Sequence, residues 1–194
     1  MAIRNTEDRR VRKTKKQLRM ALMTLLLKKD LDAITVRDVA ELADVNRGTF
    51  YAHYKDVEEL LHQLEDDLLK ELSAVGEKYK DKLNNEGAFA YLEEIFTLAG
   101  ENSDIVYALS ATNVDMAFQM KLHRELQQQY LFPFLEKLKL QGVYAELTAT
   151  FVTAGVISAT VRWIEGGKKE TPAELARLSG TLISRGVGAL RNEL

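Results

Sequence analysis

The scarcity of chain-breaking residues is the feature that most constrains what this sequence can fold into. Only two prolines occur in 194 residues, Pro133 and Pro172, and long stretches carry no cluster of turn-forming residues. Proline interrupts helices, and sheets need frequent turns between short strands, so a chain with so few breaks favours helices. We therefore expect an all-α fold.

The composition excludes several classes of protein. Hydrophobic residues make up 46% and charged residues 29% of the chain, which is typical of a globular protein rather than a disordered one. No cysteine is present, which excludes disulfides, thiolate metal sites and a cysteine nucleophile and agrees with a cytoplasmic location. The chain starts polar and basic and lacks an uninterrupted apolar run of membrane-spanning length, so we expect no signal peptide and no membrane.

The charge is distributed unevenly along the chain, although the net charge is only −2. Residues 1–57 contain 13 Lys and Arg against 8 Asp and Glu, whereas residues 58–194 contain 14 against 21. The N-terminal part is therefore suited to approach a polyanion such as nucleic acid, and the acidic remainder is not.

The first helix is predicted to run from Val11 to about Lys29, after a disordered tail of eight residues, because apolar side chains recur at helical spacing. Basic residues crowd its beginning, where they oppose the helix dipole. They are either a solvated face or phosphate contacts. We favour phosphate contacts and name Arg12 and Lys13 for that role.

A helix-turn-helix is predicted for residues 35–54. Thr35 is a suitable N-cap for the first short helix, with Asp38 three residues later as its capping-box partner. Asp44 and Val45 form the turn, since Asp tolerates the left-handed conformation better than most residues. Asn46 then caps a second helix that we expect to run through Tyr54.

The second of these helices has two faces. Phe50 and Tyr54 are four residues apart and are predicted to pack inward. The side chains predicted to point outward are those of Arg47, Thr49, Tyr51 and His53. Gly48 costs about 1 kcal/mol of helix stability relative to Ala, but it permits close approach to a groove.

The stretch ITVRDVAELADVNRGTFYAHYKDVEELL strongly resembles the DNA-binding region of the TetR family of bacterial transcriptional regulators. The resemblance implies that the second helix enters the DNA major groove. Positions that meet bases or nearby phosphates in the family fall on Arg37, Arg47, Gly48, Thr49 and Tyr51. Positions that hold the DNA backbone fall on Thr35, His53, Tyr54 and Lys55, and we add Asn46 to the predicted DNA-binding residues.

Chemistry ranks these candidates further. Arg37 and Arg47 are the best base readers, since a bidentate guanidinium–guanine contact is worth roughly 1–3 kcal/mol of discrimination. His53 has an alternative role as a capping or packing residue, and Tyr54 is expected to be half-buried with its hydroxyl at the surface. Val57 stands where many family members place a lysine near the phosphates, so one phosphate contact is in question.

The remainder of the chain is predicted to be a larger helical domain for ligand binding and dimerisation. We place the three-helix DNA-binding domain at residues 1–56 and this second domain at residues 57–194. After a helix from Asp56 to about residue 76, we expect helices at residues 88–99, 104–111, 115–138, 143–165 and 172–190, with Pro133 interrupting one of them.

The closing stretch resembles a TetR subgroup that includes activators of dihydroxyacetone kinase genes. That resemblance implies a homodimer in which the last two helices pair with their copies, at Gly155, Ser158, Ala159, Leu175, Leu178 and Leu182. Family members often hold a small-molecule effector between the middle helices and the dimer helices. Candidate pocket residues are Phe89, Phe96, Tyr107, Met116, Met120, Tyr130, Phe151 and Trp163, although aromatic and Met side chains at helical spacing are commonly core residues.

The function predicted from these patterns is a TetR-type regulator, a dimer that binds a palindromic operator with effector-modulated affinity. The alternative is a helical regulator whose DNA-binding head is degenerate and which acts through a protein partner. An enzyme is not expected, because no nucleophile elbow, phosphate loop, dinucleotide fingerprint or HExxH motif occurs. We predict no cofactor and no metal. Effector, operator and the choice between repressor and activator stay open.

Overall fold

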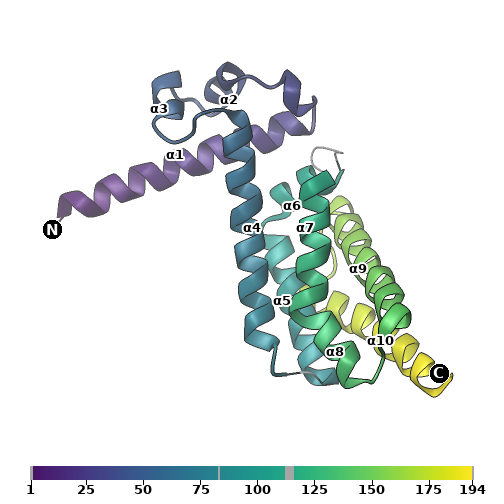
Figure 1. The fold of residues 1–194 in the computed structure, drawn as a ribbon. Coiled ribbons are helices and arrows are strands. Elements are labelled where there is room, and N and C mark those ends of the chain that lie inside the picture. The colour runs from purple at the N-terminus through teal and green to yellow at the C-terminus, as the bar shows by residue number, and fades with distance from the viewer. Residues whose placement is uncertain (1, 83, 112–115, 194) are drawn as a thin grey trace. The chain divides into compact units, whose positions relative to one another are not determined.

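The structure, a computed structural model, describes residues 2–82, 84–111 and 116–193, and every regular element within these ranges is helical (Figure 1). This confirms the all-α fold. The elements in chain order are α1 Ala2–Leu26, η1 Leu31–Ala33, α2 Val36–Leu42, α3 Arg47–Tyr51, α4 Val57–Tyr79, α5 Asn85–Glu101, α6 Ser103–Ala111, α7 Met116–Leu126, η2 Gln127–Leu131, α8 Phe132–Lys137, α9 Gly142–Glu165 and α10 Pro172–Glu193.

The chain divides into two compact units, which we call the head and the body. The head comprises residues 2–67 with residues 108–111, and the body comprises residues 68–107 with residues 116–193. α4 contributes to both units. The domain boundary expected between residues 56 and 57 stays a prediction.

The head is built around a small apolar core. α1 packs against α2, and α2 against α3. Fully buried side chains come from each of its principal helices, namely Leu18 and Leu22 of α1, Val39 of α2, Phe50 of α3, and Leu60 and Leu61 of α4. This core fixes the spacing between the two short helices of the predicted helix-turn-helix.

α1 differs from the expectation at its beginning. The helix starts at Ala2, so the disordered tail predicted for the first eight residues is wrong for residues 2–8. No proline or glycine occurs between Ala2 and Leu26, and nothing in this stretch forces the helix to stop. The polar composition that indicated a tail is equally compatible with a solvated helix.

The body is a bundle in which α10 packs mainly against α5, and α9 contacts α7, η2 and α8. Its core joins Tyr91 and Phe96 of α5, Tyr130 of η2, Phe134 of α8, and Trp163 of α9. Edge-to-face packing of Phe96 and Trp163, with ring centroids 6.4 Å apart, ties α5 to α9.

Pro133 interrupts its helical region, as predicted. η2 is a π-helical turn directly before α8, and Pro133 occupies the first turn of α8. Proline has no N–H to donate to the carbonyl four residues earlier, and a wider turn relieves the clash. Across the interruption Tyr130 and Phe134 stay on one face, with their rings stacked at 6.0 Å, and both belong to the core of the body.

Candidate nucleic-acid interface and effector cavity

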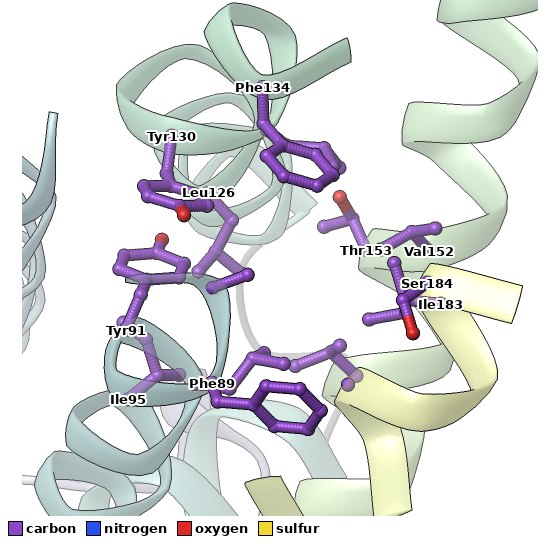
Figure 2. A pocket seen from close by; sticks show the side chains of 15 residues that line it. Phe89, Tyr91, Ile95, Leu126, Tyr130, Phe134, Val152, Thr153, Ile183 and Ser184 are labelled. Carbon is purple, nitrogen blue, oxygen red and sulfur yellow. The ribbon is translucent and has the colours of Figure 1, made fainter. Parts of the chain in front are cut away.

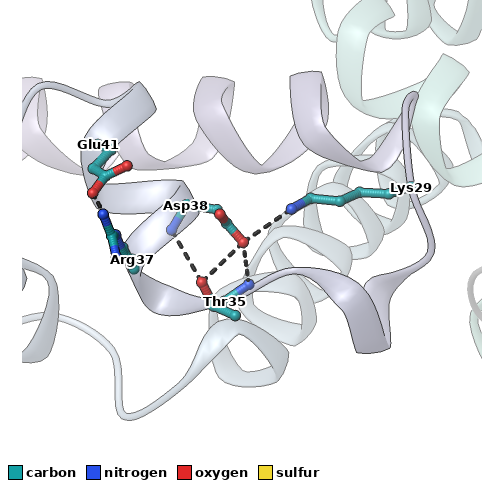
Figure 3. A network of polar contacts seen from close by, with 5 residues as sticks. All are labelled: Lys29, Thr35, Arg37, Asp38 and Glu41. Carbon is teal, nitrogen blue, oxygen red and sulfur yellow. Dashed lines mark hydrogen bonds and ion pairs between the residues drawn. The ribbon is translucent and has the colours of Figure 1, made fainter.

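A closed capping box fixes the start of α2. The Asp38 N–H donates to Thr35 Oγ1 at 3.2 Å, and the Thr35 N–H donates to Asp38 Oδ2 at 2.8 Å (Figure 3). The Lys29 ammonium donates to the same carboxylate oxygen at 2.9 Å. The Thr35 backbone N–H and then Lys29 lower the pKa of Asp38 to about 2. The predicted cap is therefore confirmed, with Lys29 as an added partner.

The turn and the second cap also agree with the sequence. Asp44 adopts φ 53°, the left-handed conformation expected there. Asn46 precedes α3, and its Oδ1 accepts from the Thr49 N–H at 2.7 Å and from Thr49 Oγ1 at 3.0 Å. The left-handed Asp44 and the Asn46 cap together define the turn, and the burial of Phe50 then orients α3 on the core.

α3 is shorter than predicted. It ends at Tyr51 rather than Tyr54, with Ala52 as its C-cap. Two further backbone bonds continue the turn of the chain, from the His53 and Tyr54 N–H groups to the Phe50 carbonyl at 2.9 and 3.0 Å. The stop has a local cause: Asp56 accepts from the Glu59 N–H at 2.7 Å and thereby caps α4, so the chain must leave the helix before it.

The two faces of α3 are divided as the spacing predicts. Phe50 is 0% and Tyr54 3% exposed, whereas Tyr51 is 58% exposed. Arg47 and Gly48 are exposed, and Thr49 and His53 are half-buried. Arg47, Gly48 and Tyr51 therefore form an outward row on α3, and the inner side of this segment is fixed by the buried Phe50 and Tyr54.

The flanking candidates are polar or basic residues that are also exposed. Arg12 and Lys13 of α1 are exposed, as are Thr35, Asn46 and Lys55. Arg37 is exposed too, but its Nε donates to Glu41 at 2.6 Å, one helical turn away. Glu41 thus holds Nε of Arg37 and places a negative charge beside the guanidinium.

Tyr54 and Val57 belong to the core of the head. The hydroxyl of Tyr54 is buried, so its expected position at the surface is wrong, and a contact with the DNA backbone is not available to it. The ring packs on Phe50, the Lys15 ammonium lies over it, and the Arg19 guanidinium, which pairs with Asp67, is close to the hydroxyl. Val57 is only 7% exposed, so the residue that replaces the usual lysine is a packing residue.

The Arg19–Asp67 pair was not predicted from the sequence. Burial tends to lower the pKa of Arg19, but the Tyr54 hydroxyl and the Asp67 carboxylate outweigh this effect and raise it. The pair ties α1 to α4 beneath Tyr54. A separation of 48 residues leaves no periodic signal in the sequence.

The body contains an interior cavity of about 60 Å³. Two of the predicted pocket residues, Phe89 and Tyr130, line it (Figure 2). The other lining residues are Ala88, Tyr91, Leu92, Ile95, Leu126, Leu131, Phe134, Val152, Thr153, Val156, Gly180, Ile183 and Ser184. The cavity therefore lies between α5, the η2–α8 region and the two final helices.

The other pocket predictions do not reach this cavity. Phe96 and Trp163 are core residues that pack on each other, and Tyr107 is half-buried elsewhere in the body. Met116, Met120 and Phe151 are wrong as interior residues, since they are 68%, 60% and 82% exposed. Helical spacing groups side chains on a face, but it does not tell which face is covered.

A wide apolar groove of about 900 Å³ runs along α9 and α10. Four of the predicted dimer residues line it: Gly155, Ala159, Leu178 and Leu182. Ser158 is exposed nearby on α9. Leu175 is the exception, because it is 8% exposed and belongs to the core of its own chain.

Among the described residues, α9 is the one helix that is long and apolar enough to cross a membrane, and 28% of the apolar 18-residue segment within it is buried. Its apolar side chains serve the cavity wall and the groove, which accounts for its composition. In the described ranges, no three His, Cys, Asp or Glu residues gather into a possible metal site.

A capped helix-turn-helix head joined to a helical body with its own cavity is the architecture of a one-component transcriptional regulator. Residues 20–64 match the family described as bacterial regulatory proteins, tetR family, and residues 86–185 match a transcriptional regulator C-terminal region. The protein belongs to the TetR family, whose members are DNA-binding transcriptional regulators.

Individual relatives agree with this assignment. An uncharacterized HTH-type transcriptional regulator, YxbF from Bacillus subtilis (strain 168), is 29% identical over 88% of this chain and 44% of its own length, so the chain spans less than half of that relative. The TetR transcriptional regulator of Streptococcus agalactiae 2603V is 27% identical, with a TM-score of 0.58 over 92% of this chain and 97% of that one.

The dihydroxyacetone kinase operon activator DhaS shares the fold at a TM-score of 0.57 and 16% identity, over 91% of this chain and 97% of that one. At this identity the likeness extends to the fold alone. The expected subgroup is therefore only loosely supported.

Proposed function

We propose that this protein is a sequence-specific transcriptional regulator that inserts α3 into the major groove of duplex DNA. The observation that carries the proposal is the outward row of α3, in which Arg47, Gly48 and Tyr51 are exposed above the fully buried Phe50. A reading helix needs this combination of accessible polar groups and a rigid support. Its place of action is the cytoplasm.

Arg47 is the principal base reader in this proposal. Its guanidinium stands at the first position of α3, next to a glycine that adds no side chain between the helix and a base edge. A bidentate contact to guanine would contribute roughly 1–3 kcal/mol of discrimination against other bases. Arg37, already paired with Glu41, is the second reader.

Two such heads are needed for useful specificity, and the body offers the means to join them. Leu147, Phe151, Leu178 and Leu182 expose between 60% and 82% of their surface along the groove of α9 and α10. A contiguous apolar face of this kind is rare on a monomer and typical of a binding surface. We place the homodimer contact there, and a two-fold dimer reads a palindromic operator.

Effector control is the third part of the proposal. The interior cavity of the body gives a small molecule a place to bind. Such a molecule changes DNA affinity only if it binds the DNA-competent conformation more or less tightly than the alternative one. A ligand that lowers the DNA affinity releases the protein from its operator, and a ligand that raises the DNA affinity promotes operator binding.

The test is a selection from random duplexes, followed by binding of the selected site over a salt series. Arg47→Ala is compared with Arg162→Ala, which removes the same charge from an exposed position in the body. We expect tight, salt-sensitive binding that loses base preference in Arg47→Ala and is unchanged in Arg162→Ala.

Equal, weak binding to every duplex in all three proteins would contradict the proposal. It would favour the alternative of a degenerate head that works through a protein partner. Sedimentation at several concentrations tests the homodimer separately, with Leu178→Glu expected to give monomers.

A further inference from the structure

The cavity of the body contains a polar group without a partner. Thr153 lies on α9, is 2% exposed and lines the cavity, and its hydroxyl has no hydrogen-bond partner among the described residues (Figure 2). Two other threonines of α9 behave differently. Thr150 and Thr160 donate to the carbonyls of Glu146 and Val156 at 2.9 and 2.8 Å, the usual solution for a threonine within a helix.

A buried hydroxyl without a partner is costly, and native proteins rarely leave one unsatisfied. The hydroxyl of Thr153 therefore indicates a missing partner inside the cavity. Of the other hydroxyls in the lining, Tyr130 donates to the Lys82 carbonyl at 3.0 Å, Ser184 donates to the Thr181 carbonyl at 3.3 Å, and Tyr91 contributes a phenol whose ring stacks on Tyr130. Thr153 carries the buried hydroxyl of this lining that has no partner among the described residues, and we take it as the point of attachment for a bound molecule.

The walls of the cavity carry no formal charge at neutral pH. The lining side chains are aliphatic, aromatic or hydroxyl-bearing. Burial raises the pKa of Tyr91 and raises that of Tyr130 to about 12, so both phenols stay neutral. A charged ligand would lose its hydration here without gaining a counter-charge, which strongly disfavours carboxylates, phosphates and amines.

The volume of the cavity limits the size of the molecule that it can bind. The cavity measures about 60 Å³. An engineered cavity of roughly 150 Å³ is enough for benzene, so this one suits a molecule of a few heavy atoms. Val152, Val156 and Ile183 line both the cavity and the groove of α9 and α10, so only their side chains separate the two.

We propose that the cavity binds a small, uncharged aliphatic molecule with a single oxygen function, a short alcohol or ketone, whose oxygen bonds to the Thr153 hydroxyl. This inference rests on the proposed effector role of the body. It names the chemical class of the effector and the residue that recognises its polar end.

The experiment is a titration of the full chain, labelled at Ile and Val methyl groups, with ethanol, acetone and acetate, which have only three or four heavy atoms each. Saturable shifts are expected for the cavity methyls of Ile95, Val156 and Ile183 with the first two compounds. Ile34 is buried in the head and serves as the internal reference, because a nonspecific solvent effect would move it as well.

Three variants assign the polar contact. Thr153→Val keeps the shape and removes the hydroxyl, and we expect ethanol to bind about twofold to tenfold more weakly. Thr150→Val makes the same change on the exposed side of α9 and is expected to have no effect. Thr153→Ser keeps the hydroxyl and should keep most of the affinity, which provides a second reading if Thr153→Val folds poorly.

The inference is overturned if no cavity methyl saturates, if acetate binds as tightly as ethanol, or if Thr153→Val binds ethanol as the wild type does. Binding of the selected operator is measured in the same samples. Operator binding without alcohol binding overturns this inference alone. Alcohol binding without operator binding supports the inference for the cavity and contradicts the proposed function.

Discussion

The head and the body specify their structures in different ways. In the head, polar side chains at the ends of short helices bond to backbone N–H groups within three residues, as Thr35 and Asn46 do. In the body, apolar side chains from distant helices pack around a cavity, and the buried hydroxyl of Thr153 has no hydrogen-bond partner among the described residues. In the head, local hydrogen bonds fix the helix proposed to bind DNA. In the body, the cavity results from packing between helices that are far apart in the sequence.

The largest expected effect breaks the support of the reading helix. Phe50→Ala empties a fully buried position and should destabilise the head by about 3–5 kcal/mol. Tyr51→Ala, on the exposed face one residue later, should change stability by no more than about 0.5 kcal/mol while it weakens DNA binding. Guanidinium unfolding measures both, and similar losses in the two variants would mean that the faces of α3 are assigned wrongly.

The next effect tests the shape of the body. A Cβ at Gly180 would lie 2.6 Å from Cε1 of Phe89, so Gly180→Ala forces this ring out of place. Overpacking of this kind costs about 1–3 kcal/mol, and Phe89→Leu in the same chain should restore most of it. Gly155→Ala is the control within one chain, because nothing lies within 4 Å of its Cβ position. Gly155 also lines the groove proposed for the dimer contact, so the comparison is made at a concentration at which sedimentation shows monomers. Thermal unfolding at one low concentration compares the three, and an additive double variant would contradict steric conflict as the cause.

A smaller effect concerns the cap of α3. Asn46→Ala removes the acceptor for the Thr49 N–H and should cost about 0.5–2 kcal/mol. Asn46→Asp keeps an acceptor and should be close to wild type in stability. If urea unfolding shows that the two variants lose the same amount, the local cap does not hold α3.

The pH dependence of the head tests the other cap. The pKa of Asp38 is about 2 in the folded chain, below its ordinary value of 3.8. Because folding lowers this pKa, the stability that it contributes is fully present above pH 3.8 and is lost as pH falls through about 2. The difference in urea midpoint between wild type and Asp38→Asn should therefore shrink over this window. A difference that stays constant would mean that the capping box does not depend on the charge.

The smallest effect on stability sharpens the role of Arg37. Glu41→Gln removes an exposed ion pair and should leave the free energy of unfolding close to that of the wild type, because solvent screens such a pair. It also frees Arg37 and removes a negative charge near the predicted DNA surface, so operator affinity should rise at low salt. An unchanged affinity would remove Arg37 from the set of readers.

The same contrast explains what the sequence could predict. Thr35, Asp44 and Asn46 were predicted correctly because each acts within a few residues along the chain. The Arg19–Asp67 pair and the burial of the Tyr54 hydroxyl were missed because they depend on contacts between α1 and α4, which local patterns do not contain.

In the body, aromatic spacing identified Phe89 and Tyr130 as cavity residues but also selected Phe151, which is 82% exposed. α9 is apolar on more than one face, so its periodicity cannot separate interior from groove. Thr153 gave no signal, because a threonine within a helix ordinarily bonds to its own backbone. Only the structure distinguishes it from Thr150 and Thr160.

The double role of Val152, Val156 and Ile183 has a consequence for how such a regulator evolves. A substitution at any of these positions alters the cavity and the groove together, so a gain in one property is tied to a change in the other. Leu126 and Thr153 line the cavity and not the groove. We therefore expect a lineage that acquires a new effector to change first at Leu126, Thr153 and similar positions, because substitutions there leave the groove of the proposed dimer contact unaltered.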